Sequence, residues 1–419
     1  MTVIHNTQAL GGTQARTDAL AIAEAAYAAI DTGAVIRAQL WFDGNILHAD
    51  GRAYDLSKYK RIRVFGFGKA SCLAIDEIGK VLQGRIERGI AIDVRPGVCA
   101  VADVWEGTHP KPSAGNVAVT ERIVSLSSEC EKDDLVIVAV SGGGSALLCW
   151  PMDECDQGTK LYDDFLHTGA TIEEMNTVRK HISQVKGGGL AKILYPATVI
   201  ALVFCDVPGE HYEEVASGPT YRDTTTVADA QAILDKYHLS GYTLSETPKE
   251  EMYFENVHNI PAISNHGALD AMQREAEARG YRVVRLGEAL YDEPAELLAR
   301  MREASGQKTV VIAGGEPRLI VTKSGGKGGR CQYVALAALE GLRPHETVLA
   351  FGSDGKDNSD AAGAIADAGT AARAAELGLS IPDALASFDT YTFFEHTNDL
   401  LMTGPTDANV SDLFMLIHE

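Results

Sequence analysis

The residues Asp134-Leu-Val-Ile-Val-Ala-Val140, followed directly by Ser141-Gly-Gly-Gly-Ser-Ala146, indicate the fold class of this chain. An apolar run without alternation is typical of a parallel strand that is covered on both faces. Three successive glycines after it are typical of a sharp turn from the strand into a helix. Similar strand-and-turn segments lie at 61–69 and 198–209, with helical segments between them. The pattern therefore predicts an α/β protein with a parallel sheet.

The second half of the chain repeats the α/β pattern after a more polar, helical stretch at 221–259. Its apolar runs include 309–313, and Leu319-Ile-Val-Thr322 returns after a proline as an expected antiparallel strand. We therefore expect two α/β domains. A larger N-terminal Rossmann-like domain with the parallel sheet would span 1–255, and a C-terminal domain with a mixed sheet would span 256–419.

The composition narrows the classes of partner. Of the 419 residues 45% are hydrophobic, which is enough for two domains with buried cores. The 58 acidic and 37 basic residues give a formal net charge of -21, and such a surface repels nucleic acids and anionic membranes. No apolar run is long enough for an ordinary membrane-spanning helix. The cysteines form no CxxC pair, so neither a disulfide framework nor a structural zinc site is expected, and the cytoplasm is the expected location.

Two glycine turns at strand ends are candidates for binding anions. In Gly66-Phe-Gly68-Lys69 the glycines allow close backbone approach, and the lysine places a cation at the start of the next helix. A surface lysine after a tight turn is the alternative. In Ser141-Gly-Gly-Gly-Ser145 several backbone N–H groups can point at one anion, beside two hydroxyl donors. This loop is neither a Walker loop nor a complete GxGxxG fingerprint, and a plain strand-to-helix turn is the alternative.

Basic residues and a carboxylate surround the next predicted strand. Arg179 and Lys180 lie on a predicted helix, and Lys186 precedes another glycine run, Gly187-Gly-Gly189. A solvated helix face is the alternative for these cations. The carboxylate of Asp206, in Asp206-Val-Pro-Gly209, could accept a proton from a hydroxyl or hold magnesium, although aspartate is also common in turns.

The C-terminal half carries a second glycine-rich region. Gly314-Gly315-Glu316 is followed by Gly325-Gly-Lys-Gly-Gly-Arg330, a loop suited to closing over phosphates. The acidic pair Asp354 and Asp357 and the turn-rich segment 403–412 come next, and exposed turns are the alternative for both. Phosphoryl transfer needs glycine cradles, cations and a carboxylate together. Their joint presence favours a phosphotransferase.

In this order the motifs resemble the glycerate 2-kinase family, which carries a C-terminal MOFRL domain, over nearly the whole chain. The matching segments are Gly68-Lys69-Ala70, Thr108-His109-Pro-Lys-Pro112, Ser141-Gly-Gly-Gly-Ser-Ala-Leu147, Asn176-Thr-Val-Arg179-Lys180-His181, Lys186-Gly-Gly-Gly-Leu190-Ala191, Asp206-Val-Pro-Gly209, Ser217-Gly-Pro-Thr220, Gly314-Gly-Glu316, Gly328-Gly-Arg330, Ser353-Asp354-Gly355, Ala361-Ala-Gly363, Thr403-Gly-Pro-Thr406 and Asn409-Val-x-Asp412. No single motif is specific, but so many in one order are.

The resemblance implies a two-domain enzyme with its active site in the interdomain cleft, which phosphorylates D-glycerate to 2-phosphoglycerate with ATP and Mg²⁺. Carried over by motif, Lys69 and Arg330 would stabilise charge on the transferring phosphoryl group, and Asp206 would act as base on the substrate hydroxyl. The other expected nucleotide contacts are Ser141, Gly142, Gly143, Gly144, Ser145, Lys186, Gly187, Gly188, Gly315, Glu316, Gly329 and Asp354. The expected substrate contacts are Gly68, Arg179, Lys180 and Asn409, and the expected metal ligands are Asp206, Glu316 and Asp354.

The chain departs from the family pattern at a few positions. Cys331-Gln332-Tyr333 stands where the family usually has Asn-Gln-Glu, and Ser353, Asn358-Ser359 and Glu210 also differ from the usual residues. These differences leave the choice of hydroxy acid open, so a kinase of a related sugar acid is an alternative. A nicotinamide-dependent reductase of hydroxypyruvate or tartronate semialdehyde and a non-catalytic nucleotide sensor are two more. No nucleic acid or membrane partner is expected, and a homodimer is one candidate oligomeric state.

Overall fold

The computed structural model describes residues 2–206, 209–322 and 326–419. Val207 and Pro208 of the Asp-Val-Pro-Gly segment and Gly325 of the expected phosphate loop lie outside the described residues. The chain forms two compact units, each built around its own large sheet. The parallel-sheet unit comprises Thr32–Cys205 and His211–Ala262, and the mixed-sheet unit comprises Met1–Asp31, Asp206–Glu210 and Ile263–Glu419.

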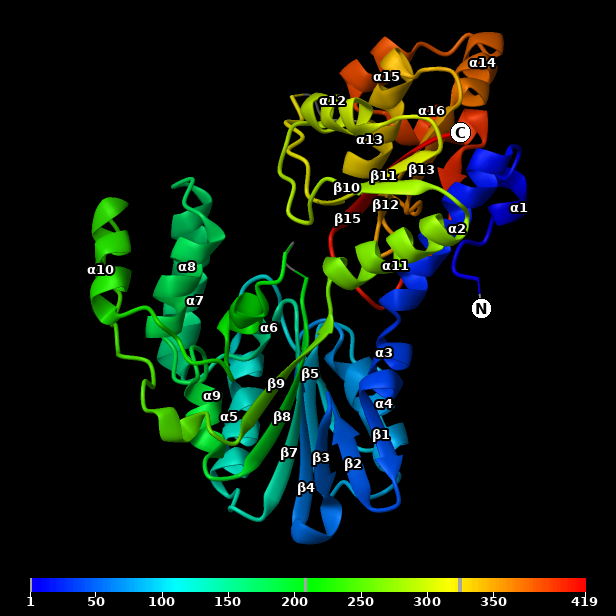
Figure 1. The fold of residues 1–419 in the computed structure, drawn as a ribbon. Coiled ribbons are helices and arrows are strands. Elements are labelled where there is room, and N and C mark those ends of the chain that lie inside the picture. Colours follow the sequence, from blue (N-terminus) through cyan, green and yellow to red (C-terminus); the bar gives the residue numbers. More distant parts are fainter. Residues whose placement is uncertain (1, 207–208, 323–325) are drawn as a thin grey trace. The chain divides into compact units, whose positions relative to one another are not determined.

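The parallel-sheet unit contains six strands in the order β6-β5-β4-β7-β8-β9 (Figure 1). They are β4 (Arg61–Phe67), β5 (Arg88–Asp93), β6 (Asp103–Glu106), β7 (Asp134–Ser141), β8 (Thr198–Phe204) and β9 (Val257–Ile263). The pairs from β6 through β8 are parallel, so the carboxyl ends of these strands lie along one edge of the sheet. Every residue of β7 is buried, in agreement with its continuous apolar sequence.

Helices and a small second sheet complete this unit. The helices are α3 (Thr32–Gln39), α4 (Ser71–Leu82), α5 (Ala114–Ser128), α6 (Gly144–Leu147), α7 (Met152–Leu166), α8 (Ile172–His181), α9 (Gly189–Leu194) and α10 (Val227–Lys236), with short 3-10 helices at η1 (Leu56–Lys58), η2 (Tyr212–Ser217) and η3 (Glu251–Tyr253). The strands β1 (Leu40–Asp43), β2 (Ile46–Ala49) and β3 (Arg52–Asp55) form an antiparallel meander. A capping box between Thr171 and Glu174 starts α8, and basic residues fill its last turn, where the helix dipole favours positive charge.

The mixed-sheet unit contains six strands in the order β10-β11-β15-β12-β13-β14 (Figure 1). They are β10 (Arg282–Arg285), β11 (Thr309–Gly315), β12 (Glu346–Gly352), β13 (Gly363–Asp367), β14 (Leu400–Leu401) and β15 (Asp412–His418). The β10–β11 pair is parallel and the other pairs are antiparallel. The fold class predicted from the sequence is therefore confirmed, with a parallel sheet in one unit and a mixed sheet in the other.

One predicted element of the mixed sheet is wrong. Residues 316–322, which include the expected strand at 319–322, form no regular secondary structure. The antiparallel character comes instead from the C-terminal strand β15, which lies between β11 and β12. Strand pairing over about a hundred residues of chain leaves no local pattern in the sequence, and this is why the partner was misassigned.

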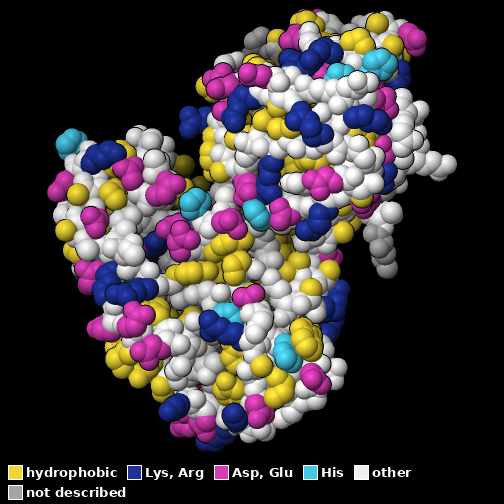
Figure 2. All heavy atoms as spheres, viewed as in Figure 1, with side chains coloured by type: hydrophobic (Ala, Val, Ile, Leu, Met, Phe, Trp, Pro, Cys, Tyr) yellow, Lys and Arg dark blue, Asp and Glu magenta, His cyan; other side chains and the backbone are white. Residues whose placement is uncertain are grey.

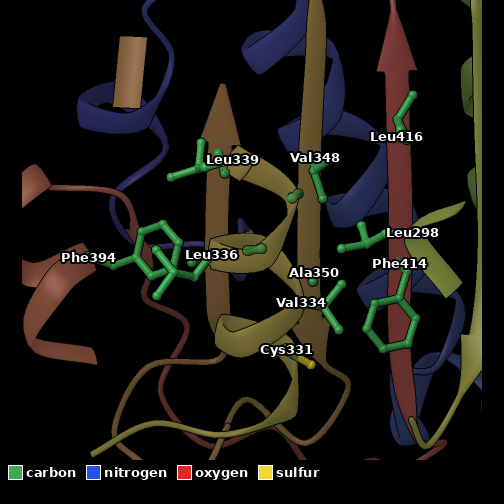
Figure 3. Close-up of a cluster of buried hydrophobic side chains, with 14 of the residues drawn as sticks. Leu298, Cys331, Val334, Leu336, Leu339, Val348, Ala350, Phe394, Phe414 and Leu416 are labelled. Carbon is green, nitrogen blue, oxygen red and sulfur yellow. The ribbon is translucent and has the colours of Figure 1, made fainter. Parts of the chain in front are cut away.

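Nine helices of the mixed-sheet unit lie in its described segments: α1 (Thr7–Leu10), α2 (Gln14–Ala29), α11 (Asn265–Ala278), α12 (Pro294–Ala304), α13 (Arg330–Ala338), η4 (Leu339–Gly341), α14 (Ala368–Glu376), α15 (Ile381–Ser387) and α16 (Thr390–Thr397). The buried face of α13, which includes Cys331 and Val334, packs against β12 and β13, and Phe414 and Leu416 of β15 belong to the same cluster (Figure 3). The N-terminal segment joins this unit through Arg16, which is buried with Asp367 at 2.6 Å and Asp399 at 2.8 Å. The sequence analysis, in contrast, expected a single boundary at 255/256.

The surface carries charges of both signs. On the face shown in Figure 2, Lys and Arg side chains lie among Asp and Glu side chains rather than in one broad basic area. Within the described residues no single helix has the length and hydropathy needed to cross a membrane, and only α2 and α3 counted as a bent pair satisfy those two criteria.

Candidate functional site

In the parallel-sheet unit, two of the predicted anion loops form one structure. They follow β4 and β7, which are adjacent and parallel, with Phe67 paired to Val140. The Lys69 N–H donates to the carbonyl of Gly142 at 2.9 Å, and the Ala70 N–H donates to Ser141 Oγ at 3.2 Å. Loops separated by more than seventy residues are thus joined at the carboxyl edge of the sheet, where open α/β sheets bind ligands.

Close packing at this junction explains two of its glycines. Gly68 has a φ of +122°, and a Cβ there would lie 2.1 Å from Ser141 Oγ. A Cβ on Gly144 would lie 2.6 Å from the Cβ of Ala216. Both positions therefore exclude any larger side chain for structural reasons. The expected ligand contacts of Gly68 and Gly144 stay predictions.

Basic side chains gather over Gly143. A Cβ on that glycine would lie 3.1 Å from Lys69 Cε and 3.1 Å from His109 Cδ2. Burial, together with the positive charges of Lys69 and Arg179, lowers the pKa of His109 to about 4. At neutral pH the loop therefore faces two cations and an uncharged imidazole, an arrangement that attracts an anion.

A hydrogen-bonded chain links the end of this loop to Arg179. Ser145 Oγ lies 2.9 Å from Ser217 Oγ, which donates to Asn176 Oδ1 at 3.2 Å. Arg179 donates to the same Asn176 oxygen at 2.6 Å. Burial lowers the pKa of Arg179 to about 10, against the opposing effect of the Glu154 and Glu214 carboxylates, so its charge is kept at neutral pH.

The neighbouring cation Lys180 is in a different environment. It is buried, and its ammonium lies 2.8 Å from Glu214 and 3.6 Å from Asp223. Arg179 instead donates to the neutral oxygen of Asn176. Both residues are predicted to hold the substrate carboxylate. Arg179 is the better candidate because no carboxylate among the described residues pairs with it as closely as Glu214 pairs with Lys180.

Lys186 occupies a structural position. Its ammonium is fully buried, forms an ion pair with Glu154 and donates to the carbonyl of Leu148 at 2.7 Å. The Gly187 and Gly188 N–H groups donate to the carbonyls of Ser217 and Gly218, at 2.9 Å and 2.8 Å. These donors are already used within the protein, so the geometry does not support the nucleotide contacts predicted for Lys186, Gly187 and Gly188.

In the mixed-sheet unit, the predicted residues of the second half line one pocket of about 340 Å³. The pocket lies where the chain leaves β11 and β12, enters β15 and begins α13. Its lining residues are Glu316, Leu319, Val321, Gly328, Gly329, Arg330, Tyr333, Asp354, Lys356, Asp357, Asn358, Phe388, Thr390, Asn409, Ser411 and Asp412. The structure thus brings Glu316, Gly329, Arg330, Asp354 and Asn409 together in one pocket, and the roles expected for them stay predictions.

Two carboxylates hold the guanidinium of Arg330 in this pocket. Arg330 Nε donates to Asp412 at 2.8 Å, and Nη1 donates to Glu316 at 3.0 Å. Burial raises the pKa of Asp412 to about 7, Arg330 opposes this rise, and the charges of Asp357 and Glu316 add to it. A carboxyl of this kind is only partly ionised near neutral pH, which leaves Arg330 with residual positive charge.

The N-terminus of α13 is occupied by an internal carboxylate. Asp357 accepts from the Cys331 N–H at 3.1 Å and the Gln332 N–H at 2.7 Å. A Cβ on Gly329 would lie 2.1 Å from Asp357 Oδ1, so this glycine permits the cap. Burial raises the pKa of Asp357 to about 6, against the opposing hydrogen bonds. The first helical N–H groups are therefore occupied by a side chain of the protein.

The remaining predicted residues lie in or near this region. Gly315 has a φ of +150° and approaches Leu290, whose carbonyl would lie 2.2 Å from a Cβ at this position. Asp354 accepts from the Lys356 N–H at 3.0 Å, and Asn409 accepts from the Ser411 N–H at 3.2 Å. Asp206 is half-buried and belongs to a short segment that groups with the mixed-sheet unit.

In the described part of the chain, no three His, Cys, Asp or Glu side chains are grouped to hold a metal. The pocket nevertheless presents carboxylate oxygens, the ligand type that Mg²⁺ prefers, from Glu316 and Asp354. Mg²⁺ commonly completes its shell with substrate phosphates and water, so these residues fit a metal that arrives with a nucleotide.

Several functional candidates were not assigned from the sequence. Asp357 and Asp412 hold Arg330 and its helix, and His109 and Asn176 stand beside Lys69 and Arg179. All four lie inside segments that the sequence analysis had singled out. Asn176, Asp357 and Asp412 each lie three residues from an assigned residue, and His109 lies only in the quoted 108–112 motif. These positions were the available signal, but which side chain faces the site depends on the fold.

Family models match both halves of the chain. A domain of unknown function, DUF4147, matches residues 18–249, and the MOFRL family matches residues 309–412. Among curated relatives, a glycerate 2-kinase of Pyrococcus horikoshii is 32% identical, covering 94% of this chain and 95% of its own. A D-glycerate 2-kinase of Thermotoga maritima is 32% identical over 85% of this chain and 90% of its own. A relative from Agrobacterium vitis that carries a hydroxypyruvate reductase name is 33% identical over 84% and 86%.

Two solved structures share the fold over nearly the full length. The glycerate kinase of Thermotoga maritima superimposes with a TM-score of 0.85 at 30% identity, covering 96% of this chain and 99% of its own. A protein from Pyrococcus horikoshii superimposes with a TM-score of 0.83 at 29% identity, covering 97% and 99%.

Proposed function

The chain belongs to the glycerate 2-kinase family defined by the DUF4147 and MOFRL domains, and from this premise we propose that it transfers the terminal phosphoryl group of ATP to D-glycerate. The product is 2-phosphoglycerate, as the family resemblance implies. The enzyme is a kinase with a nucleotide and a small hydroxy acid as its substrates.

The cations around Gly143 carry the proposal. The protein has a formal charge of -21, yet Lys69 lies over Gly143 and Arg179 is linked to the same loop by hydrogen bonds. The positive charges of both side chains act on His109, which is neutral. We assign this loop to the hydroxy acid and to the phosphoryl group that it receives. Arg179 suits the acid's carboxylate because a guanidinium can bind a carboxylate with two parallel hydrogen bonds. Lys69 suits the charge that develops on the transferring group.

The pocket of the mixed-sheet unit suits the nucleotide. Four carboxylates, from Glu316, Asp354, Asp357 and Asp412, face the cations of Arg330 and Lys356 there. Free triphosphate would be repelled by this excess of negative charge, so the pocket fits a nucleotide bound with Mg²⁺. When bound, Mg²⁺ would neutralise phosphate charge, and Glu316 and Asp354 would hold it. Arg330 would contribute its charge to the same phosphates, and Asp357 would keep its helix start in place.

The proton of the substrate hydroxyl is assigned to Asp206. A carboxylate can accept or orient this proton, and the other chemical roles are met by cations. The assignment follows the family motif Asp206-Val-Pro-Gly209 and awaits mutagenesis. Replacement by asparagine should remove most of the turnover and leave the binding of both substrates within a few fold.

The decisive experiment is a coupled assay of ADP release with Mg²⁺ and ATP. D-glycerate should be the best acceptor in a panel with L-glycerate, threonate, tartronate and erythronate, and phosphorus NMR should place the phosphate on carbon 2. If all of these hydroxy acids stay unphosphorylated, the proposal fails. The cytoplasmic location and a homodimer remain predictions, and light scattering tests the second.

A reductase is the second candidate, since the Agrobacterium vitis relative carries that name. Oxidation of NADH by hydroxypyruvate or tartronate semialdehyde with the purified chain would establish it. The expected rate is zero, because no complete GxGxxG fingerprint opens a βαβ unit in the sequence.

A further inference from the structure

The pocket of the mixed-sheet unit is lined by two chemically different sets of residues. One set is the carboxylates around Arg330. The other set is apolar or aromatic, and we call it the apolar wall: Leu319, Val321, Tyr333 and Phe388. Val321 is 59% exposed and the adjacent Ile320 is 74% exposed, so apolar surface in this part of the pocket is open to solvent. Open apolar surface beside charged groups is typical of a ligand site.

The two aromatic rings of this wall are held in a fixed arrangement. Tyr333 and Phe388 stack with ring centroids 5.7 Å apart and planes inclined by 23°. Phe388 ends α15 with a φ of +56°, which is uncommon for a bulky residue. Gly326 packs so closely on it that a Cβ would lie 2.3 Å from the Phe388 carbonyl oxygen. The glycine-rich loop thus fixes the backbone that carries this ring.

The aromatic pair is not part of the hydrophobic core. The core of this unit uses the other face of α13, with Cys331, Val334 and Ala338 toward β12 and β13 (Figure 3). Tyr333 lies three residues after Arg330, so the two side chains project from the same face of α13 into the pocket. A ligand that contacts the Tyr333 ring therefore lies about one helical turn from the Arg330 guanidinium.

These features fit one class of ligand. A nucleotide combines a planar base, which stacks on aromatic rings, with phosphates, which pair with arginine. A hydroxy acid has no group for the aromatic wall. A pocket of about 340 Å³ is large enough for most of a nucleoside.

We propose that Tyr333 and Phe388, with Leu319 and Val321, form the seat of the nucleotide base. This proposal rests on the proposed function, in which the nucleotide is the phosphoryl donor. It additionally names the residues that bind the base. The base stacks on the Tyr333–Phe388 pair, and its phosphates extend toward Arg330. Tyr333 acts in binding and takes no part in the phosphoryl transfer.

The test is calorimetric titration of the full chain with Mg-ATP and, separately, with Mg-tripolyphosphate, which has no base. Tyr333→Ala should weaken ATP binding about tenfold, equivalent to about 1.4 kcal/mol, and should leave tripolyphosphate binding within twofold. Tyr333→Phe should leave both within twofold because the ring is retained. Tyr162→Ala, which removes a half-buried tyrosine of the other unit, is the matched control and should change neither.

An equal loss for ATP and tripolyphosphate, or no loss for ATP, would overturn the base seat. If Tyr333→Ala proves unstable, Tyr333→Leu keeps apolar bulk without a ring and without added charge, and it should weaken ATP binding while leaving tripolyphosphate binding within twofold. The titration needs no acceptor. A chain that binds ATP in this way but phosphorylates no hydroxy acid would refute the proposed function and keep the base seat.

Discussion

The strand-end loop of the parallel-sheet unit and the pocket of the mixed-sheet unit contrast in charge although both are assigned to anions. Around Gly143 the charges are positive, and His109 is kept neutral with a pKa of about 4. Around Arg330 carboxylates are in excess, and burial raises the pKa of Asp412 to about 7. The first site shifts a base toward its uncharged form, and the second shifts an acid toward its uncharged form.

This contrast indicates how each site could be selective. A cationic loop with few carboxylates can bind an organic acid directly, without a metal. A pocket with excess carboxylate accepts phosphates only with a divalent cation or with its acids protonated. Under the proposed assignment, opposite local charge would therefore separate the two substrates, since the free acid would be repelled where the metal-bound nucleotide is accepted.

The largest expected effect tests whether Lys186 holds the fold or binds a ligand. Lys186→Met leaves the buried carboxylate of Glu154 without its ion-pair partner. We expect the free energy of unfolding to fall by about 3–5 kcal/mol, measured by urea denaturation. Lys192→Met, on the exposed face of α9, is the control and should stay within about 0.5 kcal/mol. A stable Lys186→Met protein with a raised KM for ATP would instead support the contact predicted from the sequence.

The next effect tests the cationic loop. Lys69→Ala should lower kcat by about 10²–10³, because a preorganised charge on the transferring group is lost. Stability should be unchanged, as it should be for the control Lys80→Ala on α4. Since Lys69 contributes to the low pKa of His109, the imidazole pKa should rise from about 4 in the variant, as NMR titration can measure. An unchanged kcat would remove this loop from the site.

A third effect follows from the raised pKa of Asp412. Its folded pKa of about 7 exceeds the ordinary value of 3.8, so the folded state binds the proton more tightly. Stability from this group is greatest below about pH 4 and is lost as the pH rises to about 7. Asp412→Asn removes this dependence. The wild type loses this contribution between pH 4 and 7, and the variant does not. The free energy of unfolding of the variant minus that of the wild type should therefore increase by about 2–3 kcal/mol over this range.

The control for this prediction is Asp133→Asn, an exposed carboxylate of the parallel-sheet unit, whose difference from wild type should not vary with pH. The contrast in charge between the two sites would be refuted if the free energy of unfolding of Asp412→Asn differed from that of the wild type by the same amount at every pH. The same variant should also raise the KM for ATP, because Arg330 loses one of the two partners that orient it.

The sequence was informative where the signal is local. Continuous apolar runs ending in glycine predicted β4 and β7, and parallel pairing then required that the loops at Lys69 and Ser141 meet. Long-range pairing had no such signal. Strand β15 takes the place that the sequence analysis gave to residues 319–322, because its neighbours β11 and β12 are distant in the chain.

Burial limited the site prediction in the same way. Lys69 and Lys186 both adjoin glycine turns, and their local sequences suggest the same role. The difference lies in Glu154, which is far from Lys186 in sequence and neutralises it inside the protein. Asp357 likewise reads as a turn residue, but it caps a helix that begins well before it in the chain. Such pairings follow from the tertiary fold and cannot be found from composition or spacing.

The smallest expected effect decides which substrate the loop at Ser145 serves. The hydroxyl of Ser217 connects Ser145 to Asn176, whose side-chain oxygen also accepts from Arg179. Ser217→Ala removes the hydroxyl and with it the hydrogen bonds to Ser145 and Asn176, and it leaves Arg179 its contact with Asn176. About 1 kcal/mol of orientation is lost, so the KM for D-glycerate should rise about fivefold with kcat unchanged. The exposed Ser128→Ala is the control. If the KM for ATP rises instead, the loop cradles nucleotide phosphates, and the assignment of opposite charges to different substrates would have to be reversed.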